Sequence, residues 1–486
     1  MGKAPTMRRV LLLLLAGAAA ALGLVQVGPP PDQIPTFATE DVTDPDRAVA
    51  SPSVWYCPWV EAGDIVDTDI LVATDVDVDV SLTLLDPLTN EAPTVTGYSI
   101  VGPGASGVDT GSTLRRGESP ALVEISDGPA AAASLAWADA LLSGDRCIVS
   151  VPKVWYLTGG ATKPGTFTEL RLFNPFADNA EVKVTAFSEF GIDLVPDLDG
   201  LDVPGRSWTT IDIERYLPLR DELAFTVTST RGLVIPVLIR TDNRGEAMWP
   251  GAAPSLTWDF PIVTIGGLEP FIAVLSAGED DIVISVDILT EDGSVRNARE
   301  ITVDSSVPAL IQLSDLAAAP FGVRLRATAP IAASVIAMFP IDGVDGAEGE
   351  IPEPGDGTTT TIEGATTTVA EVEAPMVRGL AGTVGVARPS SEWIVPIDTL
   401  PGNQTTMWVM NAGTEPVTVE ARPLGGVEFH GDEQIFTVEP GTIKRVEVDV
   451  GIGIFGYHVD ADGPVSIAWE MWGERGAVLV VGIPGQ

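Results

Sequence analysis

Short segments in which apolar and polar residues alternate recur along most of the chain. Clear examples span residues 182–187, 282–288, 417–420 and 446–450. A period of two residues is typical of a β-strand that buries one face, and each of these segments follows a turn containing Asn, Gly, Pro or Asp. No long helical period follows residue 30. The pattern therefore predicts antiparallel β-sandwiches rather than a parallel α/β sheet.

A set of three marks recurs four times. A tryptophan beside apolar residues opens each copy, and the four are Trp55, Trp155, Trp258 and Trp393. A turn then follows an apolar strand, at 73–75, 173–175, 276–278 and 411–413. A Gly or Pro step finally leads into an apolar run, at 128–130, 231–233, 329–331 and 463–465. A fixed period identifies a repeated unit. We therefore expect an all-β chain with a tandem array of four antiparallel, immunoglobulin-like β-sandwich repeats.

These marks divide most of the chain into four sandwiches. They cover residues 51–152, 153–254, 255–345 and 389–486, which we call copies 1 to 4. The interval 346–388 is acidic and rich in Pro and Thr, a composition typical of a disordered linker. Its insertion explains the longer spacing between the last two marker tryptophans. Residues 28–50, rich in Pro and Asp, indicate a second linker.

The first 27 residues differ from the rest. Basic residues precede an uncharged apolar segment, 10–27, whose length lies between that of a signal-peptide core and that of a full membrane span. The Ala-Ala-Ala sequence at 18–20 is a candidate cleavage site. Two interpretations stay open: residues 1–27 form a cytoplasmic tail and a transmembrane anchor helix, or a signal helix that is cleaved. The basic end stays inside in both. We therefore expect residues 28–486 to be extracellular, on a single-pass protein of the cell membrane or on a secreted one.

Charge excludes one class of partner. The chain carries 27 Lys and Arg against 68 Asp and Glu, a formal net charge of −41. Nucleic-acid binding requires a cationic surface, so no nucleic-acid partner is expected. Charge of this size favours solubility and attracts cations, but it does not determine a fold.

The two cysteines, Cys57 and Cys147, both lie in copy 1, near its first and last predicted strands. An even number of cysteines in an exported chain suggests a disulfide. A catalytic or metal-binding role has less support, because the spacing is wrong and no histidine is nearby. We therefore predict a Cys57–Cys147 bridge.

One acidic pattern raises the question of a cation site. Asp75, Asp77 and Asp79 alternate with valines. A Ca²⁺ loop beginning at Asp75 would need Gly at its sixth position and usually Glu at its twelfth, where this chain has Val80 and Asp86. Strict alternation instead favours a strand with carboxylates on its solvated face. The sequence thus predicts no metal site, with the three aspartates as the candidate ligands if one exists.

Catalytic signals are sparse. The two histidines, His430 and His458, both lie in copy 4, and the chain has no Gly-x-Ser-x-Gly elbow. It also has no phosphate-binding loop and no dinucleotide fingerprint. The 68 acidic residues provide too many carboxylate pairs for any pair to be informative. We therefore expect no catalytic residues, no cofactor and no enzymatic activity.

Tryptophans concentrate in copy 4, where Trp408, Trp469 and Trp472 accompany Trp393. Exposed tryptophans at a binding site could stack on sugar rings. Packing in a sandwich core is the alternative, because the opening tryptophan recurs in every copy.

At this point the chain resembles a known group of sequences. Residues 154–162, 170–175, 228–230 and 234–237 are similar to an uncharacterised actinobacterial family of membrane-anchored exported proteins with a β-rich domain of unknown function. The resemblance covers about residues 50–486 and implies an exported β-rich envelope protein. It offers no catalytic residues. Copies 1 and 3 depart from the Asn-Pro turn at 174–175, which leaves their register less defined.

Together these features predict a non-catalytic cell-envelope protein that acts as a structural or interaction scaffold. The alternative is a polysaccharide-binding or accessory protein in cell-envelope glycan assembly. The expected partner is an envelope protein or a glycan.

Overall fold

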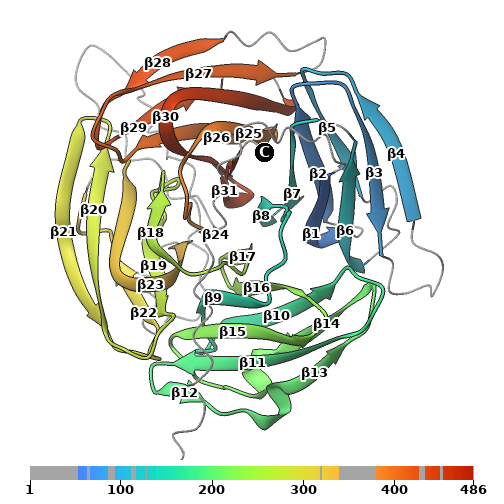
Figure 1. The fold of residues 1–486 in the computed structure, drawn as a ribbon, viewed down its shortest axis with the longest axis vertical. Helices are drawn as coiled ribbons and strands as arrows, with labels where there is room; N and C mark the ends of the chain where they lie inside the picture. Colours follow the sequence, from blue (N-terminus) through green and yellow to red (C-terminus); the bar gives the residue numbers. More distant parts are fainter. Residues whose placement is uncertain are drawn as a thin grey trace, which may run out of the picture. The chain divides into compact units, whose positions relative to one another are not determined.

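The computed structural model describes residues 53–62, 66–85, 94–110, 117–126, 128–139, 141–317, 320–338, 379–425, 433–448 and 452–484. These residues form antiparallel β-sheets, and two single-turn 3₁₀ helices are the only helical elements among them (Figure 1). The all-β antiparallel architecture is thus confirmed. The predicted N-terminal helix and the linker at 28–50 lie outside the described residues.

The described residues of copy 1 form eight strands in two sheets, with the orders β1-β6-β3-β4 and β5-β2-β7-β8. The strands are β1 (Ser53–Ala62), β2 (Asp67–Thr74), β3 (Val78–Leu84), β4 (Thr94–Ile100), β5 (Gly104–Asp109), β6 (Gly117–Ile125), β7 (Ala130–Ala138) and β8 (Leu141–Arg146).

Copy 2 repeats this arrangement, except that its fourth strand is split into two short strands, β12 and β13, which both pair with β11. Its elements are β9 (Val154–Gly160), β10 (Thr166–Asn174), β11 (Ala180–Ser188), β12 (Gly191–Asp193), η1 (Pro196–Leu198), β13 (Asp199–Val203), β14 (Ser207–Asp212), η2 (Ile213–Arg215), β15 (Leu223–Arg231), β16 (Ile235–Asp242) and β17 (Gly245–Pro250).

Copies 3 and 4 follow the same order but fuse the sixth and seventh strands into one long strand. The strands of copy 3 are β18 (Ser255–Phe260), β19 (Glu269–Ser276), β20 (Ile282–Thr290), β21 (Gly293–Val303), β22 (Ala309–Gln312), β23 (Gly322–Met338) and β24 (Leu380–Val384). The strands of copy 4 are β25 (Ser390–Thr399), β26 (Asn403–Asn411), β27 (Val417–Leu424), β28 (Gln434–Val438), β29 (Thr442–Glu447), β30 (Gly453–Gly473), β31 (Gly476–Val481) and β32 (Ile483–Pro484).

Strand order separates these sandwiches from the constant-type immunoglobulin arrangement. In that arrangement the first two strands are neighbours in one sheet. Here the first strand pairs with the sixth, as β1 does with β6, and the second strand lies in the other sheet. The immunoglobulin-like assignment is therefore not confirmed.

One boundary prediction needs correction. Residues 380–384 form β24, which pairs with β23 and belongs to the same sheet as the other strands of copy 3. The linker predicted over 346–388 therefore extends too far, and copy 3 does not end at 345. The five residues of β24 are too few for their apolar character to reveal a strand period.

The Gly or Pro step marks the point where the chain passes from one sheet to the other. In copy 2 it separates β15 from β16, and Gly232 there has a φ of 67°, a left-handed conformation that glycine adopts without a steric penalty. In copies 3 and 4 the step lies inside β23 and β30, whose two halves pair with different strands. The first half of β23 pairs with β18 and the second with β19, and the first half of β30 pairs with β25 and the second with β26.

The opening tryptophan packs in the core and is hydrogen-bonded through its indole N–H. In copies 2 and 3 the acceptor lies at the step itself: Trp155 donates to the Val234 carbonyl and Trp258 to the Ile331 carbonyl, both at 2.8 Å. Trp55 and Trp393 donate instead to nearby serines. The first and third sequence marks are thus two parts of one contact in the middle copies.

The turn after the second strand carries a buried polar residue in each copy: Thr74, Asn174, Ser276 and Asn411. Asn411 shows its role, because its side-chain amide donates to the carbonyls of Glu415 and Val438 while its oxygen accepts from the Gly413 N–H. These side chains satisfy backbone groups that the turn removes from the sheet.

Each copy packs against the next, and copy 4 packs against copy 1. The contacts join β1 to β16, β9 to β23, β18 to β30, and β25 to β2. Neighbouring copies share buried clusters; Trp258 of copy 3 and Trp408 of copy 4, for example, belong to the same one. The last strands of the four sandwiches, β8, β17, β24 and β31, also contact one another in cyclic order (Figure 1). Residues 50–486 thus form one compact unit.

Candidate functional site

A cleft of about 470 Å³ lies between copies 3 and 4. Its walls come from the loop between β18 and β19 and from β26, β29 and β30, with Glu291 from the turn between β20 and β21 and Pro320 from the segment before β23. Ligand pockets in proteins typically enclose about 300–1,000 Å³, so the cleft has the size of a small-molecule or sugar site.

Trp472 forms an aromatic wall of this cleft and lies against the copy 3 loop. Gly266 in that loop has a φ of 51°, and a Cβ atom at this position would approach the indole ring to 2.9 Å. Glycine therefore allows both the left-handed turn and the close approach of the ring. The indole is only partly buried, unlike that of Trp408, which is 3% exposed.

Glu470 places a carboxyl group in the cleft. Its side chain comes from β30 and accepts a hydrogen bond from the Trp408 indole N–H at 2.9 Å. Its second oxygen, Oε2, has no hydrogen-bond partner among the described residues. Burial raises the pKa of Glu470 to about 7, although Trp408 and the charge of Arg445 oppose the shift. The cleft thus contains a carboxyl group that titrates near neutral pH.

A second hollow, of about 520 Å³, adjoins the cleft and shares Gln404, Thr406 and Arg445 with it. Asn403, which also lines it, has buried amide atoms that lack hydrogen-bond partners in the described part of the chain. Together the two hollows form a groove with amide, guanidinium, carboxyl and indole groups. We call it the copy 4 groove.

Replacing Glu470 by glutamine tests the raised pKa. Between the ordinary pKa of 4.5 and about pH 7, the Glu470 carboxyl group is protonated in the folded state but ionised in the unfolded state. This contribution to stability is fully present below the ordinary pKa and is lost as the pH rises through the folded pKa. Relative to the wild type, Glu470→Gln should therefore gain about 2–3 kcal/mol of unfolding free energy between about pH 5 and pH 8. Urea unfolding of both proteins at several pH values measures this. A difference that stays constant with pH would contradict it.

The predicted disulfide is confirmed. Cys57 on β1 is bonded to Cys147, which directly follows β8, with Cα atoms 4.4 Å apart. Both residues are buried in the core of copy 1. The bridge connects the two sheets of that sandwich, since β1 and β8 lie in different ones.

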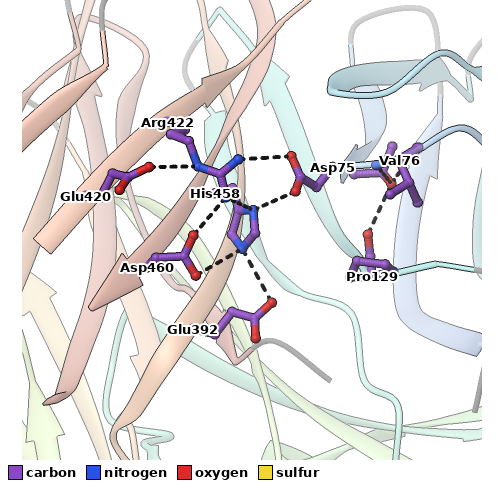
Figure 2. A network of polar contacts seen from close by, with 9 residues as sticks. Asp75, Val76, Pro129, Glu392, Glu420, Arg422, His458 and Asp460 are labelled. Atoms are coloured by element: carbon purple, nitrogen blue, oxygen red, sulfur yellow. Dashed lines mark hydrogen bonds and ion pairs between the residues drawn. The ribbon is translucent and has the colours of Figure 1, made fainter. Parts of the chain in front are cut away.

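The three candidate aspartates have different partners. Asp77 accepts a hydrogen bond from the Gly102 N–H at 2.9 Å, and Asp79 accepts one from the Ser99 hydroxyl at 2.6 Å. Asp75 lies in the turn after β2 and faces His458 and Arg422 of copy 4 (Figure 2). The three are therefore not gathered around one point among the residues described.

The structure places the two histidines and the copy 4 tryptophans in different environments. His430 lies outside the described residues. His458 is a buried residue of β30 at the junction of copies 1 and 4. Trp393 and Trp469 are core residues, whereas Trp408 and Trp472 line the cleft. Sequence reasoning missed Glu392, Glu470 and the pairs Glu420–Arg422 and His458–Asp460. The spacing of two residues in each pair was a signal that its members share one face of a strand.

Comparison with known proteins gives a family match but no activity. Residues 111–348 match the model of a family described as a family of unknown function, DUF5719. The match begins before β6 and includes all of copy 2 and the strands of copy 3 up to β23. No curated protein is significantly similar to the chain. Within the described residues there is no helix with the length and apolar character of a membrane span.

Proposed function

We propose that this chain is a non-catalytic, exported cell-envelope protein that acts as a structural or interaction scaffold. The observation that carries this proposal is that the copies share packing features rather than chemistry. The opening tryptophan and the polar turn residue recur in all four copies. Position 470, which supplies a buried carboxyl group to the cleft, corresponds by register to Leu135, Ile239 and Ile336 in the other copies.

Export is supported by two features. The apolar segment at 10–27 has the character of an anchor or signal, and the two cysteines form a disulfide. Disulfides persist in oxidising compartments and are rare in the cytosol. We propose that residues 28–486 are outside the membrane and are held there by the N-terminal segment or released after its cleavage.

The scaffold proposal is tested by assaying the full chain, purified in a mild detergent, against envelope polysaccharides and model esters. We expect no turnover above the uncatalysed rate. Turnover that disappears in Glu470→Gln, with circular dichroism unchanged, would show that the raised-pKa carboxyl group acts in catalysis.

A second function, glycan binding, is favoured by the copy 4 groove. Its amide and charged groups suit a hydroxyl-rich ligand, and the partly exposed Trp472 provides a surface on which a sugar ring could stack. The groove joins two hollows that share lining residues, which suits a chain of sugars better than a monosaccharide.

Replacing Trp472 by alanine should weaken glycan binding at least about tenfold, the loss expected when a central aromatic contact is truncated. Trp137 is a matched control, because it faces Asp67 across β2 and β7 just as Trp472 faces Gln404 across β26 and β30. Trp137→Ala should leave affinity unchanged. Titration calorimetry with envelope oligosaccharides measures both. Equal affinities for all three proteins would reject the groove as the glycan site.

A further inference from the structure

A polar cluster joins copy 4 to copy 1 outside the groove (Figure 2). Its core is formed by adjacent strands of one sheet: Glu392 on β25 stands opposite Asp460 on β30, and Asp460 stands opposite Glu420 on β27. His458 lies two residues before Asp460, so alternation along β30 places both on the same face. Asp75 reaches this face from the turn after β2 of copy 1.

His458 is the decisive member of the cluster. The side chain is about nine-tenths buried, with 7% of its surface exposed, and its Nε2 atom has no hydrogen-bond partner among the described residues. This nitrogen points toward two carboxylates, 3.4 Å from Glu392 Oε1 and 3.6 Å from Asp460 Oδ1 (Figure 2). A buried ring nitrogen without a hydrogen bond is a costly arrangement unless something occupies the space before it.

The spacing of these atoms fits a metal ion. Nitrogen and oxygen ligands lie about 2.0–2.2 Å from Zn²⁺, which places neighbouring ligand atoms of a tetrahedron about 3.3–3.6 Å apart. The three candidate ligand atoms all lie within 4.8 Å of one another. Small side-chain rotations would therefore bring all three into the coordination range of a single ion.

The surrounding residues orient the ligands as the second shell of a metal site does. Asp75 Oδ2 lies 3.0 Å from Nδ1 of His458, so a proton on Nδ1 leaves the lone pair of Nε2 directed at the two carboxylates. Arg422 Nη2 donates to Asp460 Oδ2 at 2.7 Å, which leaves Asp460 Oδ1 available to an ion. The same Nη2 lies 3.0 Å from Nδ1. In the ion-bound arrangement that contact is not a hydrogen bond, because both atoms carry hydrogens.

The charge of the cluster favours a cation. Among the described residues, four carboxylates, those of Asp75, Glu392, Glu420 and Asp460, face one guanidinium, that of Arg422. With His458 neutral, a net charge of −3 remains at a partly buried junction. A divalent ion would lower the mutual repulsion of these carboxylates.

We propose that Glu392, His458 and Asp460 bind a divalent transition-metal ion of the zinc class, and that Asp75 positions His458 for it. One imidazole with two carboxylates suits Zn²⁺ or Mn²⁺ better than Ca²⁺, which prefers an all-oxygen set. Because Asp75 belongs to copy 1 and the three ligands to copy 4, the ion would strengthen the contact between the first and last copies.

The test uses the full chain, stripped of metal with a chelator in a mild detergent and titrated with Zn²⁺ by calorimetry. We expect one ion per chain, and at least about a hundredfold weaker binding in His458→Ala, which loses a direct ligand. Asp75→Asn should weaken binding about 10–100-fold, as second-shell changes do. Asp79→Asn, an exposed aspartate outside the cluster, should bind like the wild type.

Two further measurements keep the proposal falsifiable if His458→Ala fails to fold. Glu392→Gln alters a partly exposed ligand, and we expect it to lower affinity at least about tenfold. Co²⁺ bound to the wild type should give visible absorption bands that Glu392→Gln and Asp75→Asn shift or remove. The proposal is overturned if Zn²⁺ binds the wild type no more tightly than Glu392→Gln, or if Asp79→Asn weakens binding as much as Asp75→Asn.

Discussion

Asp259→Asn should lower the free energy of unfolding by about 3–5 kcal/mol, the cost of breaking a buried ion pair by removing one charge. Asp259 is 2% exposed and its two oxygens lie 2.6 and 2.8 Å from Nε and Nη2 of Arg324. Ser466 of copy 4 also donates its hydroxyl to Asp259, and Arg324 donates to the carbonyl of Ala412. The substitution leaves the guanidinium without its charged partner at the junction of copies 3 and 4.

Asp199→Asn is the matched control, because it makes the same chemical change in an exposed pair. Lys183 and Asp199 lie 3.4 Å apart with side chains 51% and 61% exposed. Surface pairs of this kind contribute at most about 1 kcal/mol. Urea unfolding followed by tryptophan fluorescence compares the two variants with the wild type. Equal shifts of the unfolding midpoint would show that the Asp259 pair contributes no more than a surface pair does.

Removing the Cys57–Cys147 bridge should have an effect of similar size. The bridge closes a loop with a sequence separation of 90 residues. In the chain-entropy model, a loop of this length stabilises the folded state by about 4–5 kcal/mol relative to the reduced chain. The double variant Cys57→Ser, Cys147→Ser should therefore unfold at a lower urea concentration than the wild type.

Adding reductant separates the loss of the disulfide bond from any change in packing caused by the two serines. The wild type should lose stability when it is reduced, whereas the double serine variant should be insensitive to reductant. Unfolding curves of both proteins with and without reductant provide the measurement. If reduction left the wild-type curve unchanged while the bridge was shown by mass spectrometry to be broken, the predicted stabilisation would be wrong.

Local pattern was sufficient to predict the strands and the repeat. Alternation at 182–187 and 282–288 falls within β11 and β20. The structure also gives the spacing between the opening tryptophan and the step a cause within one copy, since Trp155 and Trp258 donate to carbonyls at or directly after the step. The cysteine pair was predicted because its two positions mark the start and end of one sandwich.

Contacts between copies could not be predicted in this way. Alternation shows that His458 and Asp460 share a face of β30, but not that Asp75 from another copy reaches them. The cleft around Glu470 could not be predicted either, because the local sequence does not show that a loop of copy 3 lies against this part of copy 4. Sheet pairing and packing between copies depend on the whole fold, and a two-residue period carries no information about either.

Because copy 4 contacts copy 1, neither the first nor the last copy is a terminal repeat with only one neighbour. In open solenoids the terminal units have one neighbour, tend to fray, and require special capping sequences. Here every copy has a neighbour on both sides. Loss of any one copy would expose two buried surfaces at once, so partial unfolding from an end offers no easy path. We therefore expect the four copies to melt together, with hydrogen-exchange protection spread evenly among them rather than declining toward either terminus.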